Sequence, residues 1–107
     1  MNGILPPDLI RQDDDINGAF VDIQQAFSIT NRLVTDRNCA YRAECLFNAI
    51  KILCLTNRDK IDRLVFLARQ IAAGADAARD YECWPLVDRE IEYVREELRP
   101  FFPQKNS

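Results

Sequence analysis

The chain of 107 residues is 48% hydrophobic and 29% charged, and it carries a net charge of −3. This composition is that of a globular protein and excludes a disordered chain, and the length fits one domain, residues 1–107. The acidic pI of about 4.9, together with the lack of a basic patch, argues against nucleic acid as a direct partner.

The sequence shows no pattern of an export signal or of a membrane span. The N-terminal stretch lacks a basic region followed by an apolar run, and the longest apolar run is far short of the ~20 residues that a bilayer requires. We therefore expect a cytoplasmic protein with no membrane partner. In that compartment the cysteines stay reduced, and core packing explains them better than disulfides. These cysteines are Cys39, Cys45, Cys54 and Cys83.

Residues 1–12 are expected to form an extended N-terminal arm. Pro6 and Pro7 push the residue before each of them toward an extended conformation, and Leu5 gives the arm an apolar side chain. The acids Asp13–Asp15 fit the N-cap and first turn of a helix, where negative charge is favoured. A first helix is therefore predicted from about Asp15 to Val34.

The second predicted helix, from about Cys39 to Leu55, contains the most apolar stretch of the chain. Only Asn48 and Lys51 interrupt the apolar residues between Cys45 and Leu55. A helix this apolar is expected to be covered by protein on nearly every side. The stretch is therefore predicted to be the central scaffold of the fold.

A third helix is predicted to begin at Thr56, because Thr56 and Asp59 have the spacing of a helix-capping pair. Its predicted buried stripe consists of Ile61, Leu64, Val65, Ala68, Ile71, Ala72 and Ala75. Gly74 is expected to loosen its last turn. The alanine-rich stretch 72–78 predicts close approach by a neighbouring helix.

A fourth helix is predicted from Pro85 to Leu98, with Pro100 ending it and residues 100–107 forming a tail. Its apolar residues form a narrow seam with the spacing of a coiled coil, namely Val87, Ile91, Val94 and Leu98. The seam either docks on the other helices or pairs with a second copy, and the high apolar content favours a homodimer. The predicted fold is all-α, a small four-helix bundle-like domain with up-and-down helices.

Several residue types that carry enzyme chemistry are missing. The chain has no histidine, which removes the commonest general base and the commonest zinc ligand. No C-x₂-C pair is present, and Gly3, Gly18 and Gly74 are too scattered for a phosphate-binding loop. We expect no enzyme activity, no catalytic residue, no cofactor and no metal.

Surface recognition of another protein is the function that these exclusions favour. Phe101 and Phe102, between two prolines, either cover an open end of the bundle or anchor a partner, since aromatic side chains dominate binding hot spots. The predicted partner-binding residues are Leu5, Trp84, Tyr93, Leu98, Phe101 and Phe102.

In size, acidity and apparent build, the whole chain resembles the small QslA-like antiactivators of LuxR-type quorum-sensing regulators. No diagnostic motif carries this resemblance, and it assigns no binding residue. It implies a protein that covers a transcriptional regulator's surface and so blocks its dimerisation or DNA contact. The alternative hypothesis is a redox-responsive helical protein, with Cys39, Cys45 or Cys83 as the reactive thiol, or a bundle that holds a small apolar ligand.

Overall fold

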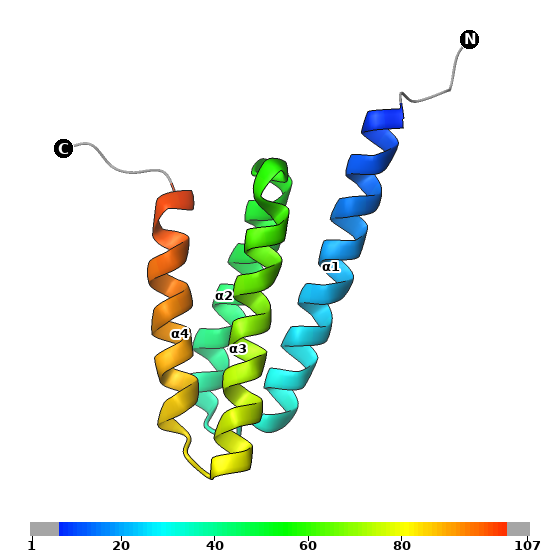
Figure 1. Ribbon diagram of the computed structural model, residues 1–107. Helices are drawn as coiled ribbons and strands as arrows, with labels where there is room; N and C mark the ends of the chain where they lie inside the picture. Colours follow the sequence, from blue (N-terminus) through cyan, green and yellow to red (C-terminus); the bar gives the residue numbers. More distant parts are fainter. Residues whose placement is uncertain (1–6, 103–107) are drawn as a thin grey trace, which may run out of the picture.

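The computed structural model describes the backbone of residues 7–102 and the side chains of residues 15–102. Four α-helices and two short 3₁₀ turns make up this part of the chain (Figure 1). They are α1 (Pro7–Leu33), α2 (Arg37–Thr56), η1 (Arg58–Lys60), α3 (Ile61–Tyr81), α4 (Pro85–Leu98) and η2 (Arg99–Phe101). The predicted all-α fold with four up-and-down helices is confirmed.

The four helices enclose a single core. In Figure 1, α3 stands between α1 and α4, and α2 lies behind it; α2 packs against all three other helices. The rings of Phe27 and Phe47 stack at a centroid distance of 5.5 Å and join α1 to α2. Complete burial of aliphatic side chains, such as Ile23 and Ile71, stabilises the fold by about 1.5–3 kcal/mol for each residue.

The first helix begins earlier than predicted. Residues 7–12 are helical, so the predicted extended arm is wrong over that range, and residues 1–6, including Leu5, lie outside the described residues. Proline is well tolerated in the first turn of a helix because the N–H group it lacks would have no partner there, and Pro7 therefore starts α1. Asp13–Asp15 lie inside α1 and do not cap it.

The prediction of α2 as a central scaffold is wrong. Ile52 and Leu55, inside the apolar stretch, are 63% and 50% exposed. The buried side of α2 consists of Cys39, Ala43, Phe47, Ile50, Leu53 and Cys54. The stretch is apolar on both sides of the helix, and only one side faces the core.

The central helix is α3. Its predicted buried stripe is confirmed, and further residues, among them Leu67 and Ala78, are also buried. Gly74 does not loosen the helix, which continues to Tyr81. A Cβ atom on Gly74 would lie 2.6 Å from Cγ of Glu90, so this glycine allows α3 and α4 to approach closely, as the alanine-rich stretch predicts.

The turn before α3 differs from the predicted cap. Thr56 is the last residue of α2, and its hydroxyl donates a hydrogen bond to the Leu53 carbonyl at 3.4 Å. The backbone N–H of Asn57 caps α2 by donating to the same carbonyl. The T-x-x-D pattern therefore reflects the end of one helix and the 3₁₀ turn η1, rather than the start of the next helix.

The apolar seam of α4 faces the bundle. Val87, Ile91, Val94 and Leu98 are all 0–1% exposed, so the seam packs inside this chain and is not available to a second copy. The 3₁₀ turn η2 continues the path of α4 to Phe101, so the predicted tail begins with a helical turn.

Candidate interaction surface

The outward side of α2 carries a continuous row of side chains that no other part of the described structure covers. The residues follow 4-3-4-3 spacing, the spacing of a helix that packs along another helix, and all are exposed. We call them the outer row; it consists of Tyr41, Cys45, Asn48, Ile52 and Leu55. Tyr41, 65% exposed, lies at one end of the row, the aliphatic Ile52 and Leu55 lie at the other end, and the polar Asn48 is at its centre.

A fairly long α-helix makes this row possible. Asp36 caps α2 at its N-terminus, with its carboxylate accepting a hydrogen bond from the Cys39 backbone N–H at 3.0 Å. At 3.6 residues per turn, residues seven apart return to the same face, so Tyr41, Asn48 and Leu55 align. The row therefore extends over most of the helix.

Two opposite charges, Glu44 and Lys51, flank the row on its α1 side. They are seven residues apart and so share one face of α2. Lys51 donates a hydrogen bond to the side-chain carbonyl of Gln24 on α1, at 2.9 Å. Among residues 15–102, no carboxylate forms an ion pair with Lys51, and no cation forms one with Glu44.

The other flank of α2 has its charges satisfied within the chain. Arg42 forms ion pairs with two carboxylates of α4, Asp88 at 3.2 Å and Glu92. These contacts tie α2 to α4 across the bundle surface. A partner would find little unpaired charge on this side.

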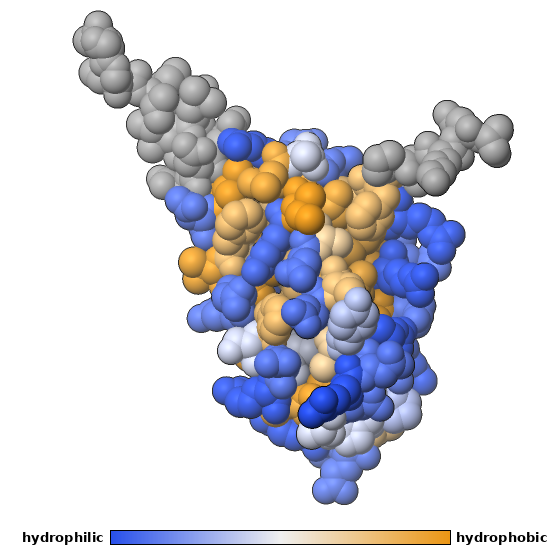
Figure 2. Space-filling model, turned by 180° about the vertical axis from the view of Figure 1, so that it is seen from behind, coloured by the Kyte–Doolittle hydropathy of each residue, from blue (hydrophilic) through white to orange (hydrophobic). Residues whose placement is uncertain are grey.

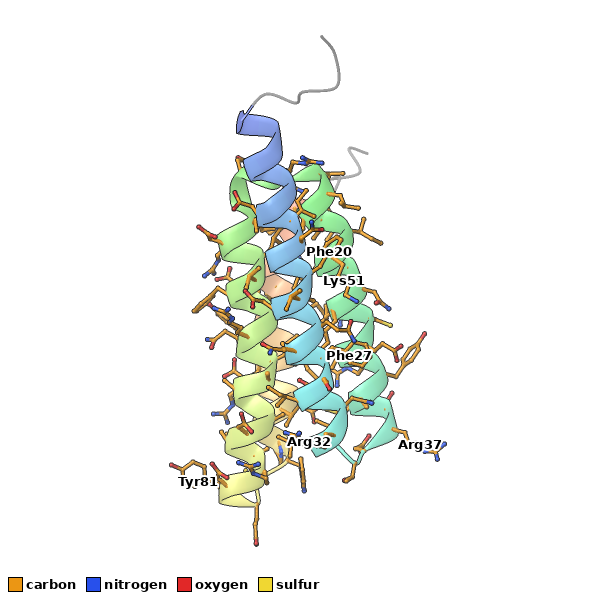
Figure 3. All side chains as sticks on the ribbon, turned by 90° about the vertical axis from the view of Figure 1, so that its right-hand side faces the viewer. Phe20, Phe27, Arg32, Arg37, Lys51 and Tyr81 are labelled. Atoms are coloured by element: carbon orange, nitrogen blue, oxygen red, sulfur yellow. The ribbon has the colours of Figure 1, made fainter. Side chains whose placement is uncertain are left out.

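A shallow groove of about 560 Å³ runs along the α1 side of the row. It is lined by Phe20, Val21, Gln24, Gln25, Ser28 and Lys51. Figure 3 shows Phe20 of α1 beside Lys51 of α2 in this groove. Val21 is 60% exposed, so the groove extends the apolar surface beyond α2.

A second groove of about 290 Å³ lies on the α4 side. It is lined by Tyr41, Arg42, Cys45, Leu46, Ile91, Arg95 and Phe102. Figure 2 views the molecule from the side of α2, where apolar side chains gather in the half that holds the C-terminal ends of α2 and α4, and hydrophilic ones in the other half. The outer row and its two grooves form one surface.

No protein-family model, no curated protein and no solved structure matches this chain.

The structure separates the predicted partner-binding residues. Leu98 is fully buried, which removes it from the candidates. Phe101 packs against the core, with the Lys60 ammonium 5.5 Å from its ring centroid, so it covers the end of the bundle. Phe102 is 41% exposed and lines the groove between α2 and α4.

Two further candidates lie at the surface but away from the outer row. Trp84 is 41% exposed in the turn before α4, and Tyr93 is 40% exposed on α4. Neither lines either groove. The partner-binding role of both residues stays a prediction.

The cysteines fall into different environments. Burial raises the pKa of Cys54 to about 11, and burial with a hydrogen bond to Asp88 raises the pKa of Cys39 to about 11. These thiols are protonated at neutral pH and poorly reactive. Cys45 is exposed in the outer row, and its hydrogen bond with the Tyr41 side chain raises the pKa of Tyr41.

Within the part of the chain that the structure describes, no cluster of three or more His, Cys, Asp or Glu side chains is placed to hold a metal ion. In the same part, no helix combines the length and apolar character needed to cross a lipid bilayer.

The spacing of the outer row is present in the sequence, but neighbouring apolar residues make it indistinguishable. Its 4-3 spacing lies inside a stretch in which nearly every residue is apolar, so the inward and outward faces of α2 cannot be told apart there. A stretch without charge on either face predicts complete burial, whereas here one apolar face of α2 is exposed.

Proposed function

We propose that this protein is a non-catalytic regulator that binds another protein through the outer row of α2 and its flanking grooves. The proposed action is steric: a helix of the partner lies along the row and is no longer available for the partner's own contacts. An antiactivator of a transcriptional regulator acts in this way, by covering a surface needed for dimerisation or DNA contact.

The observation that carries this proposal is the exposure of a helix-packing row. Scattered exposed apolar residues are normal on protein surfaces, whereas a contiguous apolar patch marks an interaction site. Ile52 and Leu55 are neighbours at one end of α2, and Tyr41 continues the row at coiled-coil spacing beyond the polar Asn48. Val21 and Phe102 are exposed in the two flanking grooves. An amphipathic partner helix, anchored at spacings of three and four residues, fits such a surface.

A photo-crosslinking amino acid at Asn48 tests the proposal in the native cell. Asn48 is polar and central in the row, so replacing it preserves the apolar contacts. We expect a covalent adduct with one other protein, identified by mass spectrometry, and loss of that adduct when Ile52→Glu is added. The matched control carries the crosslinker at Glu96 of α4, outside the surface. Adducts from Glu96 alone, or adducts at Asn48 with only the same chain, would contradict the proposal.

Exposure of Cys45 in the outer row is the observation that favours the alternative, a redox-responsive protein. A polar oxidation product at this position would weaken apolar contacts along the row. Partner capture by a Cys45→Ser variant separates the two functions. Redox control predicts that peroxide weakens capture by the natural chain but not by Cys45→Ser. Capture by the natural chain that does not change with peroxide contradicts redox control.

A further inference from the structure

The outer row has an internal symmetry that points to a specific occupant. Asn48 is at its centre, with Tyr41 seven residues before it and Leu55 seven residues after it. Cys45 lies three residues before Asn48, and Ile52 lies four residues after it. A twofold axis through Asn48 therefore brings Tyr41 against Leu55 of a second copy, and Cys45 against Ile52. The one polar side chain meets its own copy.

We propose that α2 pairs with α2 of a second copy of this chain in an antiparallel, twofold-symmetric homodimer. This interface differs from the α4 seam, which is buried within each chain. A twofold interface uses the same patch on both subunits, so the patch has to complement itself. The outer row meets that requirement, with apolar residues opposite apolar residues and an amide opposite an amide.

The unpaired charges select the antiparallel orientation. At a rise of 1.5 Å per residue, Glu44 lies about 6 Å from Asn48 toward the N-terminus of α2, and Lys51 lies about 4.5 Å from it toward the C-terminus. The twofold axis keeps both residues on the same flank and inverts their heights, so Glu44 faces Lys51 of the second copy within about 1.5 Å of the same level. Two symmetric ion pairs result, and they use two charges that have no ionic partner among residues 15–102 of the single chain.

A parallel pairing lacks this complementarity. It turns Glu44 toward the flank that carries Arg42, which Asp88 and Glu92 already neutralise. A third carboxylate there would be repelled by the other two.

The interface is small, so the dimer is expected to be weak. Stable complexes bury roughly 800 Å² on each partner, and we expect an interface built on the outer row of one helix to bury less. Dimerisation should therefore depend strongly on concentration. The inference does not need the external partner of the proposed function, because purified protein alone tests it.

Analytical ultracentrifugation of the full chain over a concentration series is the first test. We expect the mass to rise from monomer to dimer for the natural chain, and to stay that of a monomer for Ile52→Glu. Phe66→Glu, at an exposed position of α3 outside the row, is the matched control and should dimerise like the natural chain. A natural chain that is monomeric at every concentration, or an Ile52→Glu variant that dimerises like it, would overturn the proposal.

Charge reversal tests the orientation in the same instrument. Glu44→Lys should raise the dissociation constant several-fold, because it places two lysines opposite each other at two symmetric positions. Glu44→Lys combined with Lys51→Glu should restore it, and high salt should reduce both effects. A double variant as weak as the single variant would overturn the antiparallel pairing.

Mild oxidation of an Ile52→Cys variant gives a second measurement of orientation. Antiparallel pairing predicts a disulfide between Cys45 of one copy and the new cysteine of the other, found by peptide mapping. In this arrangement the two Cys45 residues lie about 9 Å apart along the helix, too far for a direct bond. A dominant Cys45–Cys45 link would overturn the proposal in favour of parallel pairing.

Discussion

Burial separates two side chains of α4 that both belong to the predicted partner-binding set. Leu98 is fully buried in the core, whereas Tyr93, five residues earlier, is 40% exposed. The 4-3 spacing places Leu98 on the apolar face of α4. A residue in the core and a residue in an interface show the same spacing, so the sequence does not distinguish the two. The structure distinguishes them because it places α3 and α2 against the seam.

Leu98→Ala should lower the free energy of unfolding by about 2–5 kcal/mol, since it removes buried methyl groups and leaves a cavity. Tyr93→Ala, the control on the same helix, should lower it by about 1 kcal/mol or less. Urea denaturation followed by circular dichroism measures both. Equal losses for the two variants would contradict the buried placement of Leu98.

The buried thiols give the fold a dependence on alkaline pH. Burial raises the pKa of Cys39 and of Cys54 to about 11 in the folded chain, from the ordinary thiol value of 9.0. As pH rises from 9 to 11, the unfolded chain loses these protons before the folded chain does. Their contribution to stability is therefore complete below pH 9 and is lost as pH rises through 11.

The free energy of unfolding should fall across that interval, by about 1.4 kcal/mol for each pKa unit of difference between the two states. Urea denaturation at a series of pH values measures the fall. For Cys54→Ala, the free energy of unfolding should start lower and fall less steeply as pH rises. An identical slope in the variant would show that Cys54 does not titrate in this way.

The two helical glycines are in opposite situations. A Cβ on Gly74 would meet Cγ and Cβ of Glu90 at 2.6 and 3.0 Å, and a Cβ on Gly18 of α1 would meet nothing within 4 Å. Both lie within helices, where alanine is the better helix former. Packing between α3 and α4 therefore makes alanine destabilising at position 74, whereas helix propensity makes it stabilising at position 18.

Gly18→Ala should raise the free energy of unfolding by about 0.5–1 kcal/mol. Gly74→Ala should lower it by about 1–3 kcal/mol, because the added methyl group forces the Glu90 side chain and α4 outward. Thermal and urea denaturation measure both variants. A stabilising Gly74→Ala would mean that α4 lies farther from α3 than the structure shows.

The elements also show what the sequence could predict. The buried stripes of α3 and α4 followed from apolar spacing, because charged residues fill their other faces and mark the outside. The start of α1 was missed because Pro7 is equally compatible with an arm and with a first helical turn. The outward face of α2 was missed because no charge marks it, and the number of neighbours around a helix depends on packing that the local sequence does not contain.

Self-association should make the stability of the folded chain depend on protein concentration. A dimer that only the folded chain forms shifts the folding equilibrium by mass action, so the melting temperature should rise with protein concentration. Ile52→Glu should melt at one temperature over the same range. Differential scanning fluorimetry or calorimetry makes the comparison, and a natural chain without any shift would contradict self-association of the folded state.

The outer row of α2 has a consequence for dosage. If the same five side chains serve both a second copy and an external helix, each dimer withholds two binding surfaces. Once dimers predominate, the concentration of free surface grows only as the square root of total protein, so doubling synthesis raises it about 1.4-fold. The geometry of one helix face would then make the supply of free binding surface less sensitive to fluctuations in the amount of this protein.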